Sequence, residues 1–273
     1  MQKLLKLSSH KPKFYDLNKK TLVFSFYLTD DFIEARANKI HKYYFNRFSH
    51  LFDECIITFL MENPENEELL NACRVWLMEA IHSKTLTFKV LKNNCMCESN
   101  VFMNEIASKL DELYGLYFFG HNKGLTAYHF NPGSQNSLDI WASGLWYLNL
   151  NFIKEVEFKM LYTSKIAFGA FTLDENTVEG EEPSTHYSGT FYWLNPSNIY
   201  LNYDGIPLLS QRGYTESFVK VLNERDKSSH EDICLPCFDM YYGLEQKIRE
   251  FFVSEEEYSD FMGVHEDMLN NIN

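Results

Sequence analysis

Apolar runs along the chain alternate with stretches in which apolar residues recur at helical spacing. The runs are rich in β-branched and aromatic residues and are long enough for buried strands, whereas the stretches between them show helical periodicity. We predict strands over residues 21–28, 55–61, 85–91, 115–119, 165–172 and 186–194. We predict helices over residues 30–50, 64–82, 104–113 and 138–161, and a mainly helical region after about residue 215.

This alternation predicts the fold class. Strands separated by helices of this length are typical of parallel βαβ units. We therefore predict an α/β fold of the Rossmann type, with a mostly parallel sheet flanked by helices and a helical C-terminal part. Asp30 or Asp31 is expected to cap the first helix, and Pro64 is expected in the first turn of the second.

The chain shows no internal repeat, low-complexity segment or interdomain linker. We expect a basic N-terminal extension over residues 1–20, one α/β domain over 21–243 and an acidic helical tail over 244–273. The 273 residues are 45% hydrophobic and 16% aromatic, which supports a large core and excludes a disordered chain.

The net charge of the chain bears on which kinds of molecule it can bind. A formal net charge of -13 argues against nucleic-acid binding, which needs clustered cations. The first twenty residues are an exception, because lysines outnumber the single acid Asp16 there: Lys3, Lys6, Lys11, Lys13, Lys19 and Lys20. This segment is either a basic arm that touches anionic lipid headgroups or a solvated extension.

The absence of targeting signals and the pattern of cysteines indicate where in the cell the protein is expected. The sequence lacks a transmembrane-length apolar run and the apolar core of a signal peptide. We expect a cytoplasmic protein with reduced cysteines, which the basic N-terminus could hold at the inner face of the membrane. Cys95 with Cys97, and Cys234 with Cys237, form two distant pairs. Their separation favours unreactive thiols over a zinc site or a redox dithiol.

Ligands of an open α/β sheet bind beyond the carboxyl ends of its strands. The candidate positions are therefore residues 27–31, 62–63, 93–94 and 121–124, which follow the first four predicted strands. The first βα turn commonly holds a nucleotide. Tyr27, Asp30 and Asp31 lie there, and either acid is a candidate contact for a ribose or a base.

The segment after the fourth predicted strand contains His121, Lys123 and Gly124. Gly124 permits a tight turn, Lys123 offers a point charge for a diphosphate, and His121 offers a second donor. A cation there would stabilise the charge that develops on a diphosphate leaving group. An ordinary polar turn is the alternative interpretation.

Two further segments carry candidate chemistry. In residues 186–193 (HYSGTFYW), His186, Ser188 and Trp193 could shape a sugar subsite, and Gly189 suggests a bulge or a close approach of ligand. A core strand is the alternative. Further along, Thr215 fits a helix N-cap, so Glu216 is either a helix-dipole partner or a general base.

These three segments occur together, in this order, in a known family. The chain resembles bacterial glycosyltransferase-like proteins of capsule and lipopolysaccharide gene clusters, related to the rhamnan-synthesis-F-like group. The family motifs H-T-K-G, a Trp-containing helix, H-F-S-G-N-F-W-W and R-x-x-x-E have counterparts in residues 121–124, Trp141, residues 186–193, and Arg212 with Glu216. The match covers about residues 110–220 well and the N-terminal part only in pattern.

The resemblance implies a GT-A-like fold and sugar transfer from a nucleotide-sugar donor to a glycan or lipid-linked acceptor in bacterial surface polysaccharide biosynthesis. It implies an inverting enzyme with Glu216 as catalytic base and Arg212 in the sugar or acceptor subsite. Residues 121–124 would lie where many GT-A enzymes carry a metal-binding Asp-x-Asp motif. Mn²⁺ or Mg²⁺ is therefore a candidate cofactor, which Lys123 could partly replace.

The sequence also departs from the family pattern. Asn122 replaces Thr, Thr190 replaces Asn, and Ala142 with Ser143 replaces a basic pair. A catalytically inactive relative that binds glycan or partners a larger synthase is thus the alternative function. A nucleotidyltransferase is less supported, because no glycine-rich phosphate loop is present.

Two acidic clusters are alternative metal ligands. They are Asp30 with Asp31, and residues 174–176 (DEN). Hard divalent cations need several converging oxygens, so solvated loops are the competing interpretation of both clusters.

Overall fold

The structure of the chain is a computed structural model. It describes residues 4–6, 18–93, 98–109, 112–122, 135–162, 165–169, 172–175, 184–187, 191–202, 205–207, 249, 252 and 254–272. Its α-helices are α1 (Arg36–Phe48), α2 (Glu67–Met78), α3 (Glu98–Glu105), α5 (Gln135–Leu150), α6 (Ile153–Tyr162), α7 (Pro196–Asn202) and α10 (Glu255–Ile272). Short 3₁₀ turns cover Ser49–Leu51 and Ala107–Lys109.

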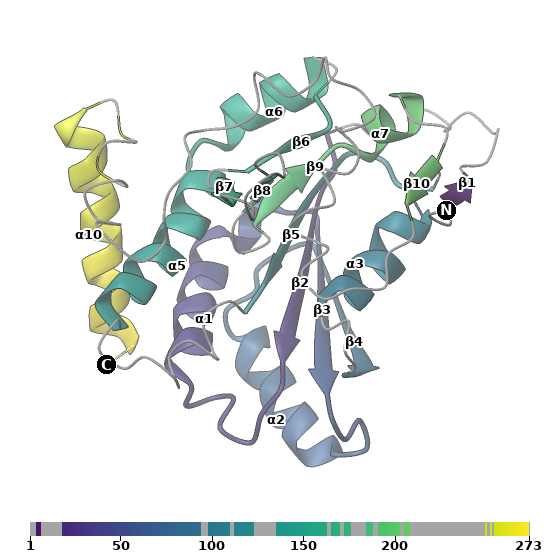
Figure 1. The fold of residues 1–273 in the computed structure, drawn as a ribbon. Coiled ribbons are helices and arrows are strands. Elements are labelled where there is room, and N and C mark those ends of the chain that lie inside the picture. The colour runs from purple at the N-terminus through teal and green to yellow at the C-terminus, as the bar shows by residue number, and fades with distance from the viewer. Residues whose placement is uncertain are drawn as a thin grey trace.

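A six-stranded sheet in the order β4-β3-β2-β5-β9-β6 forms the centre of the molecule (Figure 1). The strands are β2 (Lys20–Tyr27), β3 (Glu54–Met61), β4 (Thr85–Lys92), β5 (Leu116–His121), β6 (Ala167–Phe168) and β9 (Tyr192–Leu194). β2 pairs in parallel with β3 and β5, and β3 pairs in parallel with β4. β9 runs antiparallel to both β5 and β6. The mostly parallel sheet expected from the sequence is confirmed.

Two small antiparallel sheets accompany the central one. β1 (Leu4–Lys6) pairs with β10 (Gly205–Pro207), and β7 (Thr172–Glu175) pairs with β8 (Ser184–Tyr187). β1, near the N-terminus, therefore pairs with a segment from much later in the chain.

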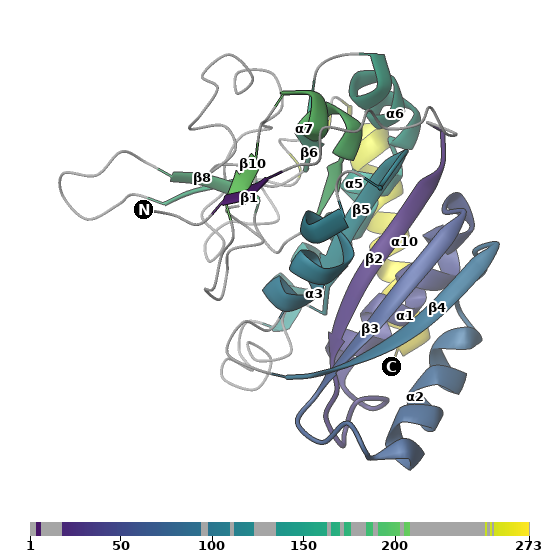
Figure 2. The same cartoon turned by 90° about the vertical axis from the view of Figure 1, so that its right-hand side faces the viewer.

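Alternate residues of β2 enter two separate layers of the core, as strand geometry requires. Leu22, Phe24 and Phe26 join the larger layer with residues of α1, α2, α5 and α10, whereas Val23 joins a smaller layer with residues of α3. Figure 2 shows α3 on one side of the sheet and α1, α2 and α10 on the other. Burial on both faces explains why the strand appears in the sequence as a continuous apolar run.

Trp146 of α5 lies in the middle of the larger layer. Its ring stacks on Phe24 at 5.5 Å and meets Phe45 and Phe191 edge-on at 5.1 and 5.3 Å between centroids. The indole Nε1 donates to Nδ1 of the buried His41 at 2.9 Å. Because an indole N–H can only donate, Nδ1 of His41 must be the acceptor, which places the proton of the neutral ring on Nε2.

The first four predicted strands lie close to the observed β2, β3, β4 and β5. The last two were wrong in extent. Residues 165–172 contain β6 and only the start of β7, and residues 186–194 are divided between β8 and β9. β7 and β8 pair with each other outside the central sheet. Hydrophobicity does not mark where a chain passes from one sheet to another.

Both predicted helix starts differ from the structure. α1 begins at Arg36 after an N-cap, Ala35, that makes no side-chain cap bond, so neither Asp30 nor Asp31 caps it. α2 begins at Glu67, and the Asn66 side chain accepts from the Leu69 N–H at 3.3 Å. Pro64 therefore precedes the helix instead of lying in its first turn.

Two later helix predictions also need correction. α3 begins at Glu98, ahead of the predicted 104–113. The predicted helix 138–161 is two helices, α5 and α6, separated by a turn at residues 151–152. α6 restarts where the N–H groups of Glu155 and Val156 both donate to the Phe152 carbonyl, each at 3.1 Å. An apolar period that continues through a turn looks like one helix in the sequence.

The acidic C-terminal segment contains α10, which has a conventional start. Ser254 precedes the helix, and its Oγ accepts from the Glu257 N–H at 3.2 Å. Acids fill the first turn, where they complement the helix dipole: Glu255, Glu256 and Glu257.

α10 packs against α1 and α5 instead of projecting from the domain (Figure 1). Phe261 and Met268 are fully buried, and the Phe261 ring lies 5.3 Å from that of Tyr147. Polar contacts join the same surfaces, because Ser143 Oγ lies 2.9 Å from His265 Nδ1. The helix is thus part of the larger core layer.

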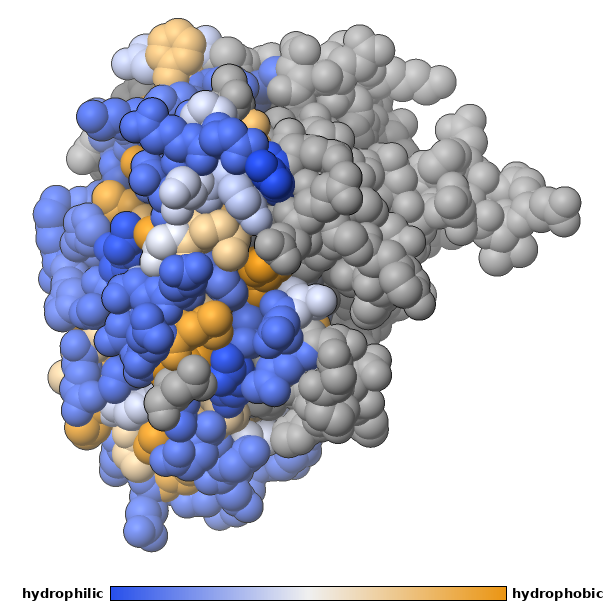
Figure 3. Space-filling view, turned by 90° about the vertical axis from the view of Figure 1, so that its left-hand side faces the viewer, coloured by the Kyte–Doolittle hydropathy of each residue, from blue (hydrophilic) through white to orange (hydrophobic). Residues whose placement is uncertain are grey.

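On the side of the molecule that carries α10, the surface formed by the described residues is mainly hydrophilic, with apolar side chains visible in separate small groups (Figure 3). Within the described ranges, none of the helices has both the length and the apolar character needed to cross a bilayer.

Candidate functional site

The strand order creates a switch point between β2 and β5. The chain passes from β2 outward to β3 and β4, and then returns to β5 on the other side of β2. In open α/β sheets the crevice at such a point, beyond the carboxyl ends of the strands, is where ligands bind. We call this region the carboxyl edge, and it contains residues 27–36, 62, 93, 121 and 122.

Asn122 holds the carboxyl edge together. Its Oδ1 accepts from the Tyr27 N–H at 3.0 Å, and its own N–H donates to the Ser25 carbonyl at 3.0 Å. Its Nδ2 donates to Asn38 Oδ1 at 3.2 Å. The buried Asn38 in turn donates to the Phe32 carbonyl at 2.9 Å. One side chain therefore joins the ends of β2 and β5 to the start of α1.

Glu62 connects the outer half of the same edge. Its Oε1 accepts from Asn93 Nδ2 at 2.8 Å and from the Tyr27 hydroxyl at 3.3 Å. Glu62 is exposed, and Tyr27 is half-buried. A carboxylate, a phenol and an amide from three successive strands thus face solvent together and can bind polar groups of a ligand.

The loop between β2 and α1 presents two exposed acids, Asp30 and Asp31. Asp31 is ordered by its neighbours, because its Oδ1 accepts from Thr29 Oγ1 at 2.6 Å and its carbonyl accepts from the Glu34 and Ala35 N–H groups. Both carboxylates lie in the first βα turn, as the sequence predicted.

Arg36 and Asp139 form a bidentate ion pair beside this loop. The guanidinium donates to the carboxylate through Nε at 3.0 and 3.2 Å and through Nη2 at 2.7 Å. The Asp139 side chain is 1% exposed and that of Arg36 is 24% exposed. The pair joins the first residue of α1 to the first turns of α5, and planar bidentate geometry of this kind is the stronger class of ion pair.

His121 lies at the end of β5 on the face that α3 covers. Its Nδ1 is 4.0 Å from Glu98 Oε2, and the two side chains are 13% and 14% exposed. In register with it are Ser25, Thr58 and Lys89 of the neighbouring strands. Lys89 donates to Glu105 of α3 at 2.6 Å. A polar row therefore crosses this face of the sheet and ends at His121.

The structure brings four of the predicted site residues to the carboxyl edge: Tyr27, Asp30, Asp31 and His121. Six lie outside the described residues, namely Lys123, Gly124, Ser188, Gly189, Arg212 and Glu216, as do Cys95, Cys97, Cys234 and Cys237. His186 lies in β8, where it pairs with Leu173 of β7.

Trp193 requires a correction. The sequence suggested a sugar subsite, but the side chain is fully buried in the core. Phe118 and Phe52 lie 5.0 and 5.6 Å from its ring, and its Nε1 donates to the Asn149 carbonyl at 3.0 Å. With its ring packed against core side chains and its N–H bonded, Trp193 stabilises the sheet and does not present a face to a sugar.

Sequence reasoning missed two parts of the edge. It included Asn122 among the positions after the fourth predicted strand and as a departure from a motif but gave it no role, and it did not single out Arg36 or Asp139. The signal for Asn122 was its position at the end of a strand. Nothing in the sequence could have paired Arg36 with Asp139, because the two residues lie 103 positions apart.

A divalent metal does not fit the described residues. The part of the chain that the structure describes holds no cluster of three or more His, Cys, Asp or Glu side chains able to bind an ion. Asp30 and Asp31 supply carboxylates, but Asp31 already accepts from Thr29, and hard cations need more converging oxygens.

A separate groove of ≈ 570 Å³ lies among α1, α2 and the end of α10. Its polar side chains already have partners within the protein. Lys42 pairs with Glu79 at 2.7 Å and lies 4.7 Å above the Trp76 ring, and Tyr43 donates to Asp267 at 2.6 Å. These groups need no ligand to satisfy them.

Comparison with known proteins does not assign the chain to a family. No protein-family model matches the sequence, and no curated protein matches it significantly.

Proposed function

We propose that the chain is a glycosyltransferase of bacterial surface polysaccharide biosynthesis, with a GT-A-like fold. It would move a sugar from a nucleotide-sugar donor to a glycan or lipid-linked acceptor. The observation that carries the proposal is the polar carboxyl edge at the β2/β5 switch point. Tyr27, Asp30, Asp31 and His121 lie along this edge, at the ends of the two strands where open α/β sheets bind nucleotides.

The nucleoside would occupy the first βα turn. Asp30 and Asp31 are exposed acceptors suited to ribose hydroxyl groups or to the N–H groups of a base. Tyr27 adds a half-buried ring at the same turn, held through its hydroxyl by Glu62. Because the two carboxylates of this loop would repel phosphate groups, the diphosphate would lie further along the edge, towards β5.

The diphosphate would lie after β5, near His121 and Lys123. A cation there stabilises the charge that grows on the leaving diphosphate as the glycosidic bond breaks. Glu216 would accept the proton of the acceptor hydroxyl, whose oxygen attacks the anomeric carbon. Arg212, His186, Ser188 and Gly189 remain proposed contacts of the sugar or acceptor, on the family resemblance alone.

Asn122 favours an active enzyme over a degenerate one. It departs from the Thr of the family motif, yet its side chain makes hydrogen bonds to Tyr27 and Asn38 that organise the edge. The substitution therefore has a structural role at this position, which supports a retained binding site.

Calorimetry with uridine and guanosine diphosphates and their sugars, with and without Mn²⁺, tests nucleotide binding. We expect one of them to bind, and His121→Gln to weaken it by about tenfold, as loss of a bond to a charged group does. His82→Gln is the matched control, since His82 is exposed and bonds Asn46. Absence of binding by the wild type would reject the enzyme and favour an inactive glycan-binding relative.

Turnover tests the catalytic role separately. Glu216→Gln should lower the rate by ~10²–10⁴, the usual contribution of a general base. Glu224→Gln makes the same isosteric change on an acid eight positions later in the sequence, to which no family motif corresponds, and should leave the rate unchanged. Wild-type turnover by the Glu216 variant would remove that residue from the mechanism. Release of pyrophosphate in place of nucleoside diphosphate would indicate a nucleotidyltransferase.

A further inference from the structure

An exposed aromatic pair lies on α6. Phe158 and Tyr162 are 65% and 77% exposed and are among the four exposed large hydrophobic side chains of the described residues. Their ring centroids are 5.5 Å apart. The helix buries Val156 and Met160 on its inner side, so the two rings form an outward-facing apolar patch.

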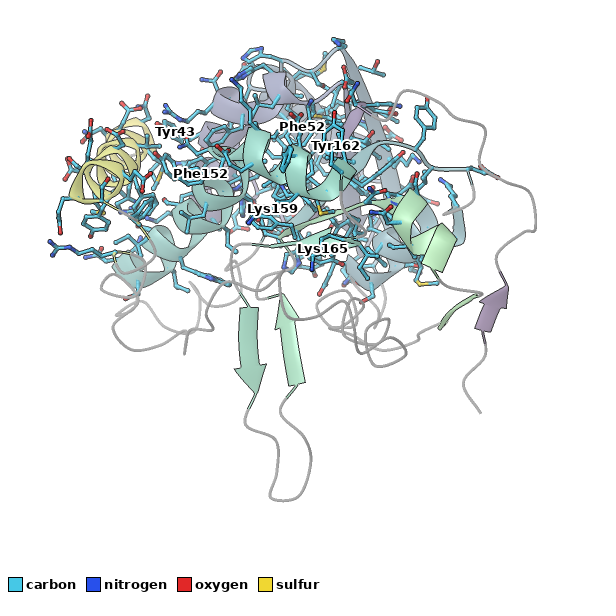
Figure 4. All side chains as sticks on the ribbon, turned by 90° about the horizontal axis from the view of Figure 1, so that it is seen from above. Tyr43, Phe52, Phe152, Lys159, Tyr162 and Lys165 are labelled. Carbon is cyan, nitrogen blue, oxygen red and sulfur yellow. The ribbon has the colours of Figure 1, made fainter. Side chains whose placement is uncertain are left out.

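Lysines surround this pair. Lys154 and Lys159 are exposed on the same helix, and Lys165 follows its end. Lys154 is one turn from Phe158, and Lys159 is one turn from Tyr162, so each lysine shares a face with a ring. Figure 4 looks down on this side of the molecule and shows Lys159, Tyr162 and Lys165 near the end of the helix. We call these five residues the α6 surface.

The α6 surface is basic although the whole chain has a formal charge of -13. Of the acids on the helix, Glu157 forms an ion pair with Lys20 at 2.5 Å, and Glu155 is exposed. The α6 surface therefore carries three lysines against these two acids of the helix, one of which already pairs with Lys20. A local excess of this sign attracts anions.

The surface lies at the amino edge of the sheet, opposite the candidate site (Figure 1). Lys20, which contacts α6, is the first residue of β2, whereas the carboxyl edge begins at the other end of that strand. The lysine-rich N-terminal segment is joined covalently to β2 at this same edge. The chain therefore enters the sheet beside α6 directly after this lysine-rich sequence.

We propose that the α6 surface binds the anionic surface of a lipid bilayer. Aromatic rings favour the headgroup region, and lysines bind the phosphates around it. A protein partner is less favoured, because two rings fall far below the roughly 800 Å² that each side of a stable protein interface buries. Weak contacts of this kind can add to those of the lysine-rich segment that precedes β2 in the sequence. Docking here turns the carboxyl edge towards the aqueous phase. The proposal does not depend on the proposed enzymatic function.

Flotation of the full chain with lipid vesicles tests the proposal. We expect binding to phosphatidylcholine vesicles that contain phosphatidylserine, little binding to pure phosphatidylcholine, and release by salt. Phe158→Ser with Tyr162→Ser should weaken binding by about tenfold or more, because both rings leave the interface. Lys154→Glu with Lys159→Glu should weaken it by at least about tenfold.

A matched control comes from α2, whose Val75 and Met78 are 61% and 58% exposed. Val75→Ser with Met78→Ser should bind vesicles as the wild type does. Three results would overturn the proposal: no wild-type binding to anionic vesicles, equal losses in the α2 control, or unchanged binding by both α6 variants. Self-association that the α6 variants abolish, without vesicle binding, would instead identify a protein contact.

Discussion

Breaking the Arg36–Asp139 pair should destabilise the protein by an amount that depends on which partner is removed. Arg36→Ala removes the guanidinium from a carboxylate that is 1% exposed, and breaking a buried ion pair by removing one partner typically costs ~3–5 kcal/mol. Asp139→Ala leaves a guanidinium whose side chain is 24% exposed and can still reach water. The loss of the Asp139 carboxylate should therefore cost only ~1.5–3 kcal/mol, the value of hydrogen bonds to a charged group.

The double variant Arg36→Ala with Asp139→Ala leaves neither charge behind. It should be less destabilised than the sum of the single variants, by a coupling energy of about 2–3 kcal/mol. Urea unfolding followed by tryptophan fluorescence measures all three, because Trp146 and Trp193 are fully buried and report on the core.

Lys39→Ala serves as the control for an ordinary surface pair. Its partner Glu34 lies 3.0 Å away with a side chain that is 79% exposed, so the loss should stay below about 1 kcal/mol. Equal costs for the two single variants of the buried pair, or strict additivity in the double variant, would refute the argument from burial.

Other predictions follow from single residues. Burial, with a hydrogen bond to Asp267, raises the pKa of Tyr43 from 10.0 to about 12. The stability that this protonated hydroxyl contributes is complete below pH 10 and is lost as pH rises through 12. Between these pH values, the free energy of unfolding of Tyr43→Phe should therefore fall less than that of the wild type. Burial also raises the pKa of the Cys55 and Cys73 thiols to about 12, and peptide mapping after iodoacetamide treatment at neutral pH should find both unmodified until the protein is unfolded. Gly115 has φ 82, and an added Cβ would lie 2.2 Å from the Lys19 carbonyl oxygen, so Gly115→Ala should lower stability by at least about 1 kcal/mol in urea. Phe261→Ala should cost ~3–5 kcal/mol in the same assay, and a smaller loss would show that α10 contributes little to the core.

The sequence predicted the parts of the fold in which local pattern and tertiary structure agree. β2, β3, β4 and β5 are buried apolar runs bounded by polar residues, so hydrophobicity located them, and the same reasoning placed Tyr27, Asp30, Asp31 and His121 at the carboxyl edge. The register that aligns these ends follows from parallel pairing, which βαβ connections favour.

The failures share a physical cause. Trp193 resembled a ligand-binding residue because an aromatic strand looks the same whether a sugar or Phe118 covers it. The turn between α5 and α6 and the separation of β8 from β9 depend on packing between elements distant in sequence. Packing of α10 depends on contacts with Tyr147 and Ser143, which are more than 100 positions away in the sequence and come close only in the folded protein.

Helix α1 is hydrogen-bonded to two distant parts of the molecule. At its start, Asn38 is bonded to Asn122 on the carboxyl edge, and on its outer side Tyr43 is bonded to Asp267 of α10. A molecule that displaced Asn122 would pull on Asn38. Because a closely packed helix shifts as a unit, the movement of α1 would also strain the hydrogen bond between Tyr43 and Asp267. Amide hydrogen exchange in α10 could therefore report an event at the carboxyl edge, without any probe attached at the edge itself.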